Sequence, residues 1–121
     1  MNPFRDQETF MKACDQTVGA FNQDQFNMYV KLIAEESQEL IDAIVANDAT
    51  ETLDALIDII VVATGAIHSL GADAEGAWKE VMSTNFAKID KETGKVRKRE
   101  DGKVLKPQGW QSPQLEQFLS K

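Results

Sequence analysis

The stretch from Glu35 to Asp58, EESQELIDAIVANDATETLDALID, decides the fold because it predicts two helices joined by a short turn. Each helix carries a column of carboxylates spaced three or four residues apart, and such spacing keeps them within roughly 60° of one another. The first column is Glu35, Glu39 and Asp42, with Glu36 to one side, and the second is Glu51, Asp54 and Asp58.

These columns have no counter-charges nearby in the chain, since residues 32–78 contain ten acidic residues and no lysine or arginine. One acid column is most simply a solvated face. Two columns joined by a short loop instead favour a shared divalent cation, as in helical proteins with carboxylate metal sites. Oxygen ligands without Cys or His favour Mg²⁺, with Mn²⁺ as an alternative, over zinc. Asp58 is the most telling acid, because it borders the apolar run 59–67, where an uncompensated carboxylate is costly.

The composition excludes several classes of protein. A net charge of −7 argues against nucleic-acid binding, which needs a basic surface. A single cysteine, Cys14, provides no disulfide and favours a reducing cytoplasmic location. The N-terminus has no apolar signal segment, and the run 59–67 is too short to span a bilayer, so we expect no membrane partner.

Apolar spacing predicts a single all-α domain over residues 1–121, with core helices over about 6–88 and a basic tail over 89–121. The expected helices are 6–18, 22–47, 48–70 and 73–88. They form a four-helix-bundle-like core with a short N-terminal helix, whose apolar stripe includes Met11 and Cys14. After Asp58 the third helix is apolar nearly all round, so we expect the protein to be oligomeric.

The tail is basic: residues 79–106 hold nine of the thirteen lysines and arginines against five acids. ETGK and EDGK carry turn signals and predict a hairpin or ordered loop at 91–105, with a last short helix from Ser112 to Leu119. Trp110 either clamps the tail or stacks on a base, and we favour the clamp. The tail either only solubilises the chain or binds phosphate groups; the second alternative, with the acid columns, indicates a metal-dependent enzyme acting on phosphoanhydrides.

The motifs EExxE (Glu35, Glu36 and Glu39) and ExxD (Glu51 and Asp54), in this order, resemble those of the all-α nucleoside triphosphate pyrophosphohydrolases. This superfamily includes MazG-like proteins, phosphoribosyl-ATP pyrophosphohydrolase and the dimeric dUTPases. The segments ETLDALIDIIVVATGAIHSLG, STNFAK and REDGKVLKPQGW are similar to its phosphoribosyl-ATP pyrophosphohydrolase-like branch. The resemblance covers most of residues 25–112.

The resemblance implies Mg²⁺-dependent cleavage between the α- and β-phosphates, giving a nucleoside monophosphate and pyrophosphate. It also implies a homodimer or homotetramer whose active site is completed by a neighbouring chain. Asn85, Lys88 and Lys106 match the downstream polar positions of this branch and are the candidates for the phosphate side. Because there are more acids than one metal needs as ligands, we also hypothesise that Glu35 or Glu36 is the general base. The implied metal ligands are Glu36, Glu39, Glu51, Asp54 and Asp58.

Two points stay open at the level of sequence. The second acidic motif is either Glu51/Asp54 or Asp54/Asp58, because in MazG-like proteins its Asp directly precedes the apolar run. The substrate is either a surplus or non-standard nucleoside triphosphate, which the long tail and extra N-terminal helix favour, or phosphoribosyl-ATP of histidine biosynthesis. A non-catalytic helical oligomer that binds nucleotide or a protein is the alternative from another class.

Overall fold

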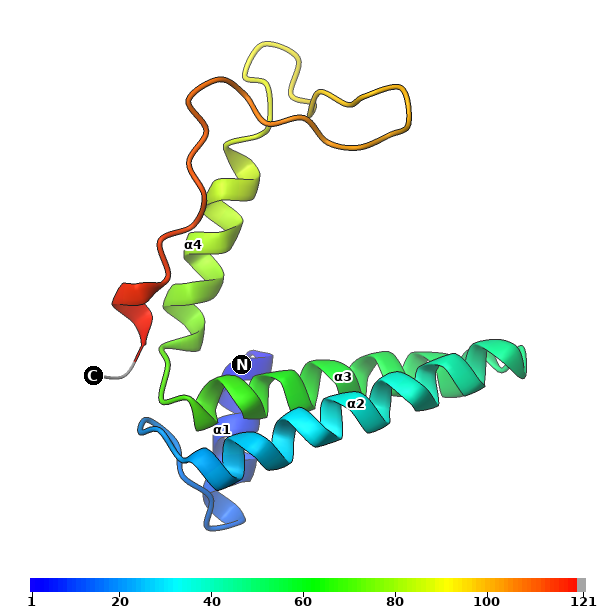
Figure 1. Ribbon diagram of the computed structural model, residues 1–121, viewed down its shortest axis with the longest axis vertical. Helices are drawn as coiled ribbons and strands as arrows, with labels where there is room; N and C mark the ends of the chain where they lie inside the picture. Colours follow the sequence, from blue (N-terminus) through cyan, green and yellow to red (C-terminus); the bar gives the residue numbers. More distant parts are fainter. Residues whose placement is uncertain (120–121) are drawn as a thin grey trace. The chain divides into compact units, whose positions relative to one another are not determined.

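The computed structural model describes residues 1–119 and confirms the all-α prediction. Its helices are α1 (Pro3–Ala13), α2 (Gln23–Val45), α3 (Ala49–Ser69), α4 (Ala74–Phe86) and the 3₁₀ helix η1 (Glu116–Phe118) (Figure 1). These residues contain no β-strand; the predicted hairpin region has only two isolated antiparallel bridges, Ile89 with Val96 and Lys98 with Val104. The chain divides into two compact units, residues 1–74 and 75–118. The single domain stays a prediction.

Helices α2 and α3 form an antiparallel hairpin, and its turn is built by Asn47 and Asp48 (Figure 1). Asn47 adopts a left-handed conformation with φ 56°, which asparagine tolerates better than most residues. The Asp48 side chain accepts a hydrogen bond of 3.1 Å from the Glu51 N–H and so begins α3. The sequence also allows a capping box, in which the Glu51 side chain would accept from the Asp48 N–H. In the structure the Asp48 N–H donates to the Ala43 carbonyl at 3.0 Å, so α2 satisfies this donor instead.

Removing this cap gives a first testable prediction. Asp48→Ala leaves the first-turn N–H groups of α3 without their side-chain acceptor, and we expect it to lower the free energy of unfolding by about 1 kcal/mol. Asp48→Asn keeps an acceptor oxygen and should remain within a few tenths of a kcal/mol of the parent. Thermal melts followed by circular dichroism measure both; equal losses in the two variants would show that the charge of Asp48, and not its cap, is what matters.

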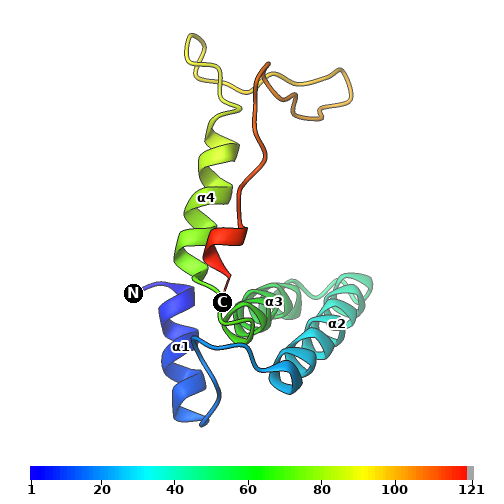
Figure 2. The same ribbon diagram turned by 60° about the vertical axis from the view of Figure 1, so that its left-hand side comes forward.

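Helix α1 packs against α3, and the core of the first unit lies where both meet α2 (Figure 2). Its buried apolar side chains are Met11, Tyr29, Val62 and Ala66. His68, 5% exposed, donates from Nε2 to the Phe4 carbonyl at 2.8 Å and thereby ties α3 to α1. Cys14, expected on the apolar stripe, is exposed: α1 ends at Ala13, so the stripe stops at Met11.

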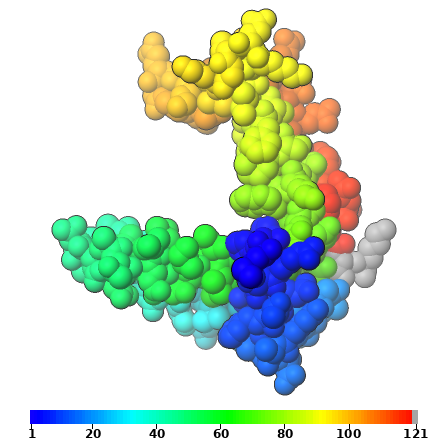
Figure 3. All heavy atoms as spheres, turned by 180° about the vertical axis from the view of Figure 1, so that it is seen from behind, coloured from blue at the N-terminus to red at the C-terminus, as the bar shows by residue number. Residues whose placement is uncertain are grey.

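Large apolar side chains remain exposed on the hairpin. Those at least 45% exposed near its turn are Ile41, Ile44, Val45, Leu53, Leu56, Ile57 and Ile60. Figure 3 shows one face of this end of the hairpin, drawn in green and cyan. An apolar surface of this kind is rare on monomeric soluble proteins and marks an interaction surface.

Helix α3 is also long and apolar enough to cross a membrane, judged by length and composition alone. The central helix of a soluble protein meets the same criteria, so this observation is weak evidence. Asp54 and Asp58 lie within α3, and its C-terminal half is buried from Val62 to Ser69 at most positions. Such a helix is typical of a packed core.

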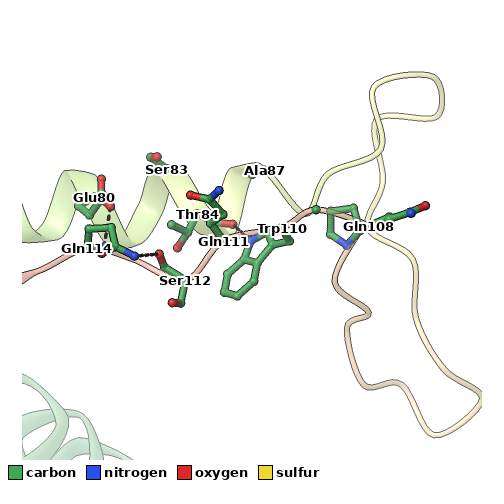
Figure 4. Close-up of a pocket in the computed structure, with 11 residues that line it drawn as sticks. Glu80, Ser83, Thr84, Ala87, Gln108, Trp110, Gln111, Ser112 and Gln114 are labelled. Carbon is green, nitrogen blue, oxygen red and sulfur yellow. Dashed lines mark hydrogen bonds between the residues drawn. The ribbon is translucent and has the colours of Figure 1, made fainter.

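In the second unit, the segment after the two turns runs back along α4 (Figure 4). The Trp110 indole N–H donates to the Thr84 carbonyl at 2.7 Å, and the Gln114 N–H donates to the Glu80 carboxylate at 2.8 Å. The predicted clamp by Trp110 is therefore confirmed. The expected last helix is shorter than predicted, because only Glu116–Phe118 form a 3₁₀ turn and residues 112–115 are extended along α4.

Candidate functional site

Four carboxylates interact across the α2–α3 hairpin: Glu36 and Glu39 from α2 and Asp54 and Asp58 from α3. Residues 36 and 39, and residues 54 and 58, are one helical turn apart, so each helix presents its pair on one side. Glu36 and Asp58 are half-buried, whereas Glu39 and Asp54 are exposed. The hairpin therefore gathers acids that are distant in sequence into one negatively charged cluster.

The electrostatics of the cluster are unfavourable for four negative charges. The Glu39 carboxyl, through a hydrogen bond and its charge, together with burial, raises the pKa of Glu36 to about 7. Burial raises the pKa of Asp58, and the charge of Asp54 acts in the same direction. One oxygen of Glu36, Oε2, is buried without a hydrogen-bond partner. Buried carboxylate oxygens without partners are costly, and within residues 1–119 no ion pair to a lysine or arginine offsets the charge of these four acids.

A divalent cation fits this donor set by chemistry. All four side chains offer oxygen, which suits Mg²⁺ or Mn²⁺, and a cation would satisfy the unpartnered Glu36 oxygen and offset the mutual repulsion. Within residues 1–119, however, no three acidic, His or Cys side chains converge closely enough to hold a metal ion. The cluster has the oxygen donors of a cation site, but its side chains would have to move closer to one another to bind a cation.

The remaining predicted acids lie outside this cluster. Glu35 and Glu51 are exposed, and neither contributes to the raised pKa of Glu36 or Asp58. Two alternatives were left open for the second motif, Glu51/Asp54 and Asp54/Asp58. In the structure Asp54 and Asp58 both interact with the cluster, and Glu51 does not. Ala55, which stands where the second alternative would have a Glu, is 3% exposed, so a long charged side chain has no room there.

The predicted phosphate-side residues also come together, in the second unit. Lys88 Nζ donates to Asn85 Oδ1 at 3.2 Å, and Lys88 Nζ lies 5.0 Å from the centre of the Trp110 ring. Lys106 Nζ lies 4.8 Å from the same ring centre. A groove of about 530 Å³ beside Trp110 is lined by α4 and by residues 107–114 (Figure 4).

Sequence reasoning favoured the clamp over base stacking for Trp110 and missed its contact with both lysines. Part of the signal was present, because aromatic rings attract ammonium groups and Lys106 stands four residues before the tail tryptophan. Spacing did not reveal it, since Lys88 and Lys106 are separated by two turns whose geometry sets their approach.

The chain is all-α and two facing helices each supply a pair of acids, an arrangement also found in helical proteins whose carboxylates bind divalent cations. Comparison with known families then identifies it further. The model of the family "Phosphoribosyl-ATP pyrophosphohydrolase" matches residues 7–85, which is more than half of the chain, and the protein belongs to this family. Among curated proteins, none matches the chain significantly.

Family membership confirms the resemblance and makes the protein a pyrophosphohydrolase that acts on a phosphoanhydride. The alternative of a non-catalytic helical oligomer is thereby disfavoured. The match also supports phosphoribosyl-ATP as substrate better than the surplus nucleotides that sequence reasoning favoured. Enzymes of this family are generally Mg²⁺-dependent, in agreement with the oxygen-only donors of the acid cluster.

Proposed function

We propose that the protein hydrolyses the α–β phosphoanhydride of a nucleotide that carries a triphosphate, with phosphoribosyl-ATP as the first candidate substrate. The products would be the corresponding monophosphate and pyrophosphate. The observation that carries this proposal is the cluster of Glu36, Glu39, Asp54 and Asp58 in a chain of this family. A cluster of acids without basic partners suits a substrate whose negative charge is brought to it with a cation.

The acid cluster would bind the metal ion and activate the attacking water. Mg²⁺ or Mn²⁺, when bound by the cluster with Glu51 in support, supplies charge neutralisation for the triphosphate. Glu36 is our candidate for taking the proton from the attacking water, because it is a half-buried acid of the cluster and its Oε2 has no hydrogen-bond partner. Glu35 is exposed and outside the cluster, which supports it less.

Asn85, Lys88 and Lys106 are the candidates for binding phosphate oxygens. An ammonium group and an amide N–H both donate hydrogen bonds to phosphate, and ammonium groups add charge. The mutual contact of Asn85 and Lys88 and the shared ring of Lys88 and Lys106 support one site made by all three.

A nucleoside triphosphate is the second candidate substrate, and one observation favours it. The family match covers residues 7–85, so Lys88, Lys106 and Trp110 lie outside the matched segment. Residues on the phosphate side that the match does not cover leave room for a substrate other than phosphoribosyl-ATP.

We further propose that the protein is a homodimer or homotetramer that covers the exposed apolar end of the α2–α3 hairpin. Side chains such as Ile57, at 51% exposed, and Leu53, at 62% exposed, support a second copy at this surface. Membership of a family of soluble enzymes is consistent with the cytoplasmic location expected from the sequence.

The decisive experiment measures pyrophosphate release from phosphoribosyl-ATP and from a panel of ribo- and deoxynucleoside triphosphates, each with Mg²⁺ and with EDTA. We expect Mg²⁺-dependent release, greatest from phosphoribosyl-ATP. Faster release from a nucleoside triphosphate would select the second candidate. A folded sample, with its mass measured by light scattering, that releases no pyrophosphate from any of these substrates would contradict the proposed function.

A further inference from the structure

The basic residues of the second unit fall into two groups. The arginines of the turns are paired with acids: Arg99 contacts Asp101 at 2.6 Å and Arg97 contacts Asp90 at 3.6 Å. Lys88 and Lys106 have no carboxylate within salt-bridge distance anywhere in residues 1–119. Other lysines of this unit also form no salt bridge within the described part of the chain, but Lys88 and Lys106 differ from them because both lie against one aromatic ring.

Trp110 brings the two ammonium groups together. Their distances to the ring centre, 5.0 and 4.8 Å, limit their separation to at most the sum of the two. The ring itself is fixed, because its N–H donates to the Thr84 carbonyl of α4 at 2.7 Å. Each ammonium gains from the negative face of the indole, yet the two repel each other, and that repulsion is relieved when an anion binds between them.

The required anion is one with more than one charged group. Two lysines beside one ring each present their own N–H donors, and a ligand with two phosphate groups can accept from both. Asn85 already accepts from Lys88 through Oδ1, which directs that ammonium group and leaves its other N–H donors for a ligand. A single phosphate would satisfy this arrangement less well than a diphosphate.

We propose that Trp110 is a positioning residue that holds Lys88 and Lys106 as a diphosphate-binding site, which binds the pyrophosphate end of the substrate without needing Mg²⁺. The inference rests on the proposed function for the source of the diphosphate, but the binding step itself does not depend on turnover. It also assigns to Trp110 a role beyond fastening the tail, because the ring determines where both positive charges lie.

The test is calorimetric titration of the full chain with inorganic pyrophosphate in EDTA, with orthophosphate titrated in parallel. We expect saturable pyrophosphate binding, about tenfold or more tighter than orthophosphate. The double variant Lys88→Gln/Lys106→Gln should weaken pyrophosphate binding about tenfold or more. The matched control Lys91→Gln/Lys98→Gln removes the same charge from exposed lysines of the same unit and should bind as the parent does.

The positioning role of Trp110 needs its own variants. Trp110→Leu removes the ring and should weaken binding as the double lysine variant does. Trp110→Phe keeps a ring but loses the N–H donor to Thr84, and should restore part of the affinity. Should Trp110→Leu fail to fold, Trp110 emission in a Trp78→Phe background decides instead. Under pyrophosphate titration we expect a saturable change in emission that is absent from the double lysine variant.

Several results would overturn the inference: no metal-free pyrophosphate binding, equal weakening by the control pair, equal affinity for orthophosphate, or a folded Trp110→Leu variant that binds normally. The outcome is separable from that of the proposed function. Turnover without metal-free pyrophosphate binding would remove this inference and keep the function, while pyrophosphate binding without turnover of any substrate would do the reverse.

Discussion

Glu36→Gln and Asp58→Asn are each expected to reduce Mg²⁺-dependent pyrophosphate release by at least about 100-fold, more than is typical for groups that only support a metal ligand. Both residues belong to the acid cluster, and both are half-buried. At such a position a water molecule cannot easily take the place of a lost carboxylate oxygen. The amide keeps the size of the side chain but removes its charge. Initial rates at saturating Mg²⁺ and substrate measure the loss.

The same substitutions should stabilise the metal-free protein. A carboxyl whose pKa is raised by folding binds its proton more tightly in the folded state, so its contribution to stability falls as pH rises from about 4.5 towards about 7. The melting temperature of Glu36→Gln should therefore exceed that of the parent at pH 8 in EDTA, with little difference at pH 5. Added Mg²⁺ should stabilise the parent and not the variant.

Asp24→Asn is the matched control, because Asp24 is an exposed acid of α2 that lies outside the cluster. It should leave both turnover and the effect of Mg²⁺ on melting unchanged. Full Mg²⁺-dependent turnover in both cluster variants would show that the catalytic acids lie elsewhere in the chain.

Gly65→Ala is expected to destabilise the protein strongly, although alanine is the better helix former by about 1 kcal/mol. A methyl group on Gly65 would overlap the Tyr29 ring. That ring is 4% exposed, and its hydroxyl donates to the Gln16 side chain, so it has no free volume to move into. We expect a loss of about 3 kcal/mol, at the upper end for overpacked cores, and a fall in melting temperature of about 10 °C or more.

The control for this prediction is the background Tyr29→Leu, which removes the ring atoms that the new methyl group would meet. In that background Gly65→Ala should be neutral or stabilising, because only the helix propensity remains. A loss of the same size in both backgrounds would mean that Tyr29 is not the obstacle and that α3 meets a different neighbour at this position.

Much of the fold was predictable because local signals agree with one another along residues 22–74. Asp48 begins α3 as predicted, Asn22 is the one of two possible caps, Asn22 or Asp24, that begins α2, and Gly71, with φ 78°, follows the end of α3. Local signals were less reliable where tertiary contacts decide. The N-terminal helix was expected to extend to residue 18, but it ends at Ala13, and the segment after it bonds instead to α2 through Gln25.

For the site, periodicity predicted which acids share a face of each helix but not which acids of the two helices meet. That depends on how the helices are aligned by the turn at Asn47 and by the close packing at Ala55, and it leaves Glu51 outside the cluster. The lysine pair was predicted only as separate phosphate contacts, because the Trp110 ring that joins them acts over a distance in sequence that no local pattern reports.

In the short segment from Leu53 to Asp58, almost every position of α3 has a structural constraint on its amino acid. Ala55 is enclosed against the rest of the hairpin, Asp54 and Asp58 face the other acids, and Leu53, Leu56 and Ile57 form the outward apolar surface. Three separate requirements therefore alternate along six consecutive codons: tight packing, charge and assembly. A substitution at any of these six positions therefore disturbs packing, the acid cluster or the apolar surface. We expect changes in substrate preference to arise outside this segment, in the tail beyond α4.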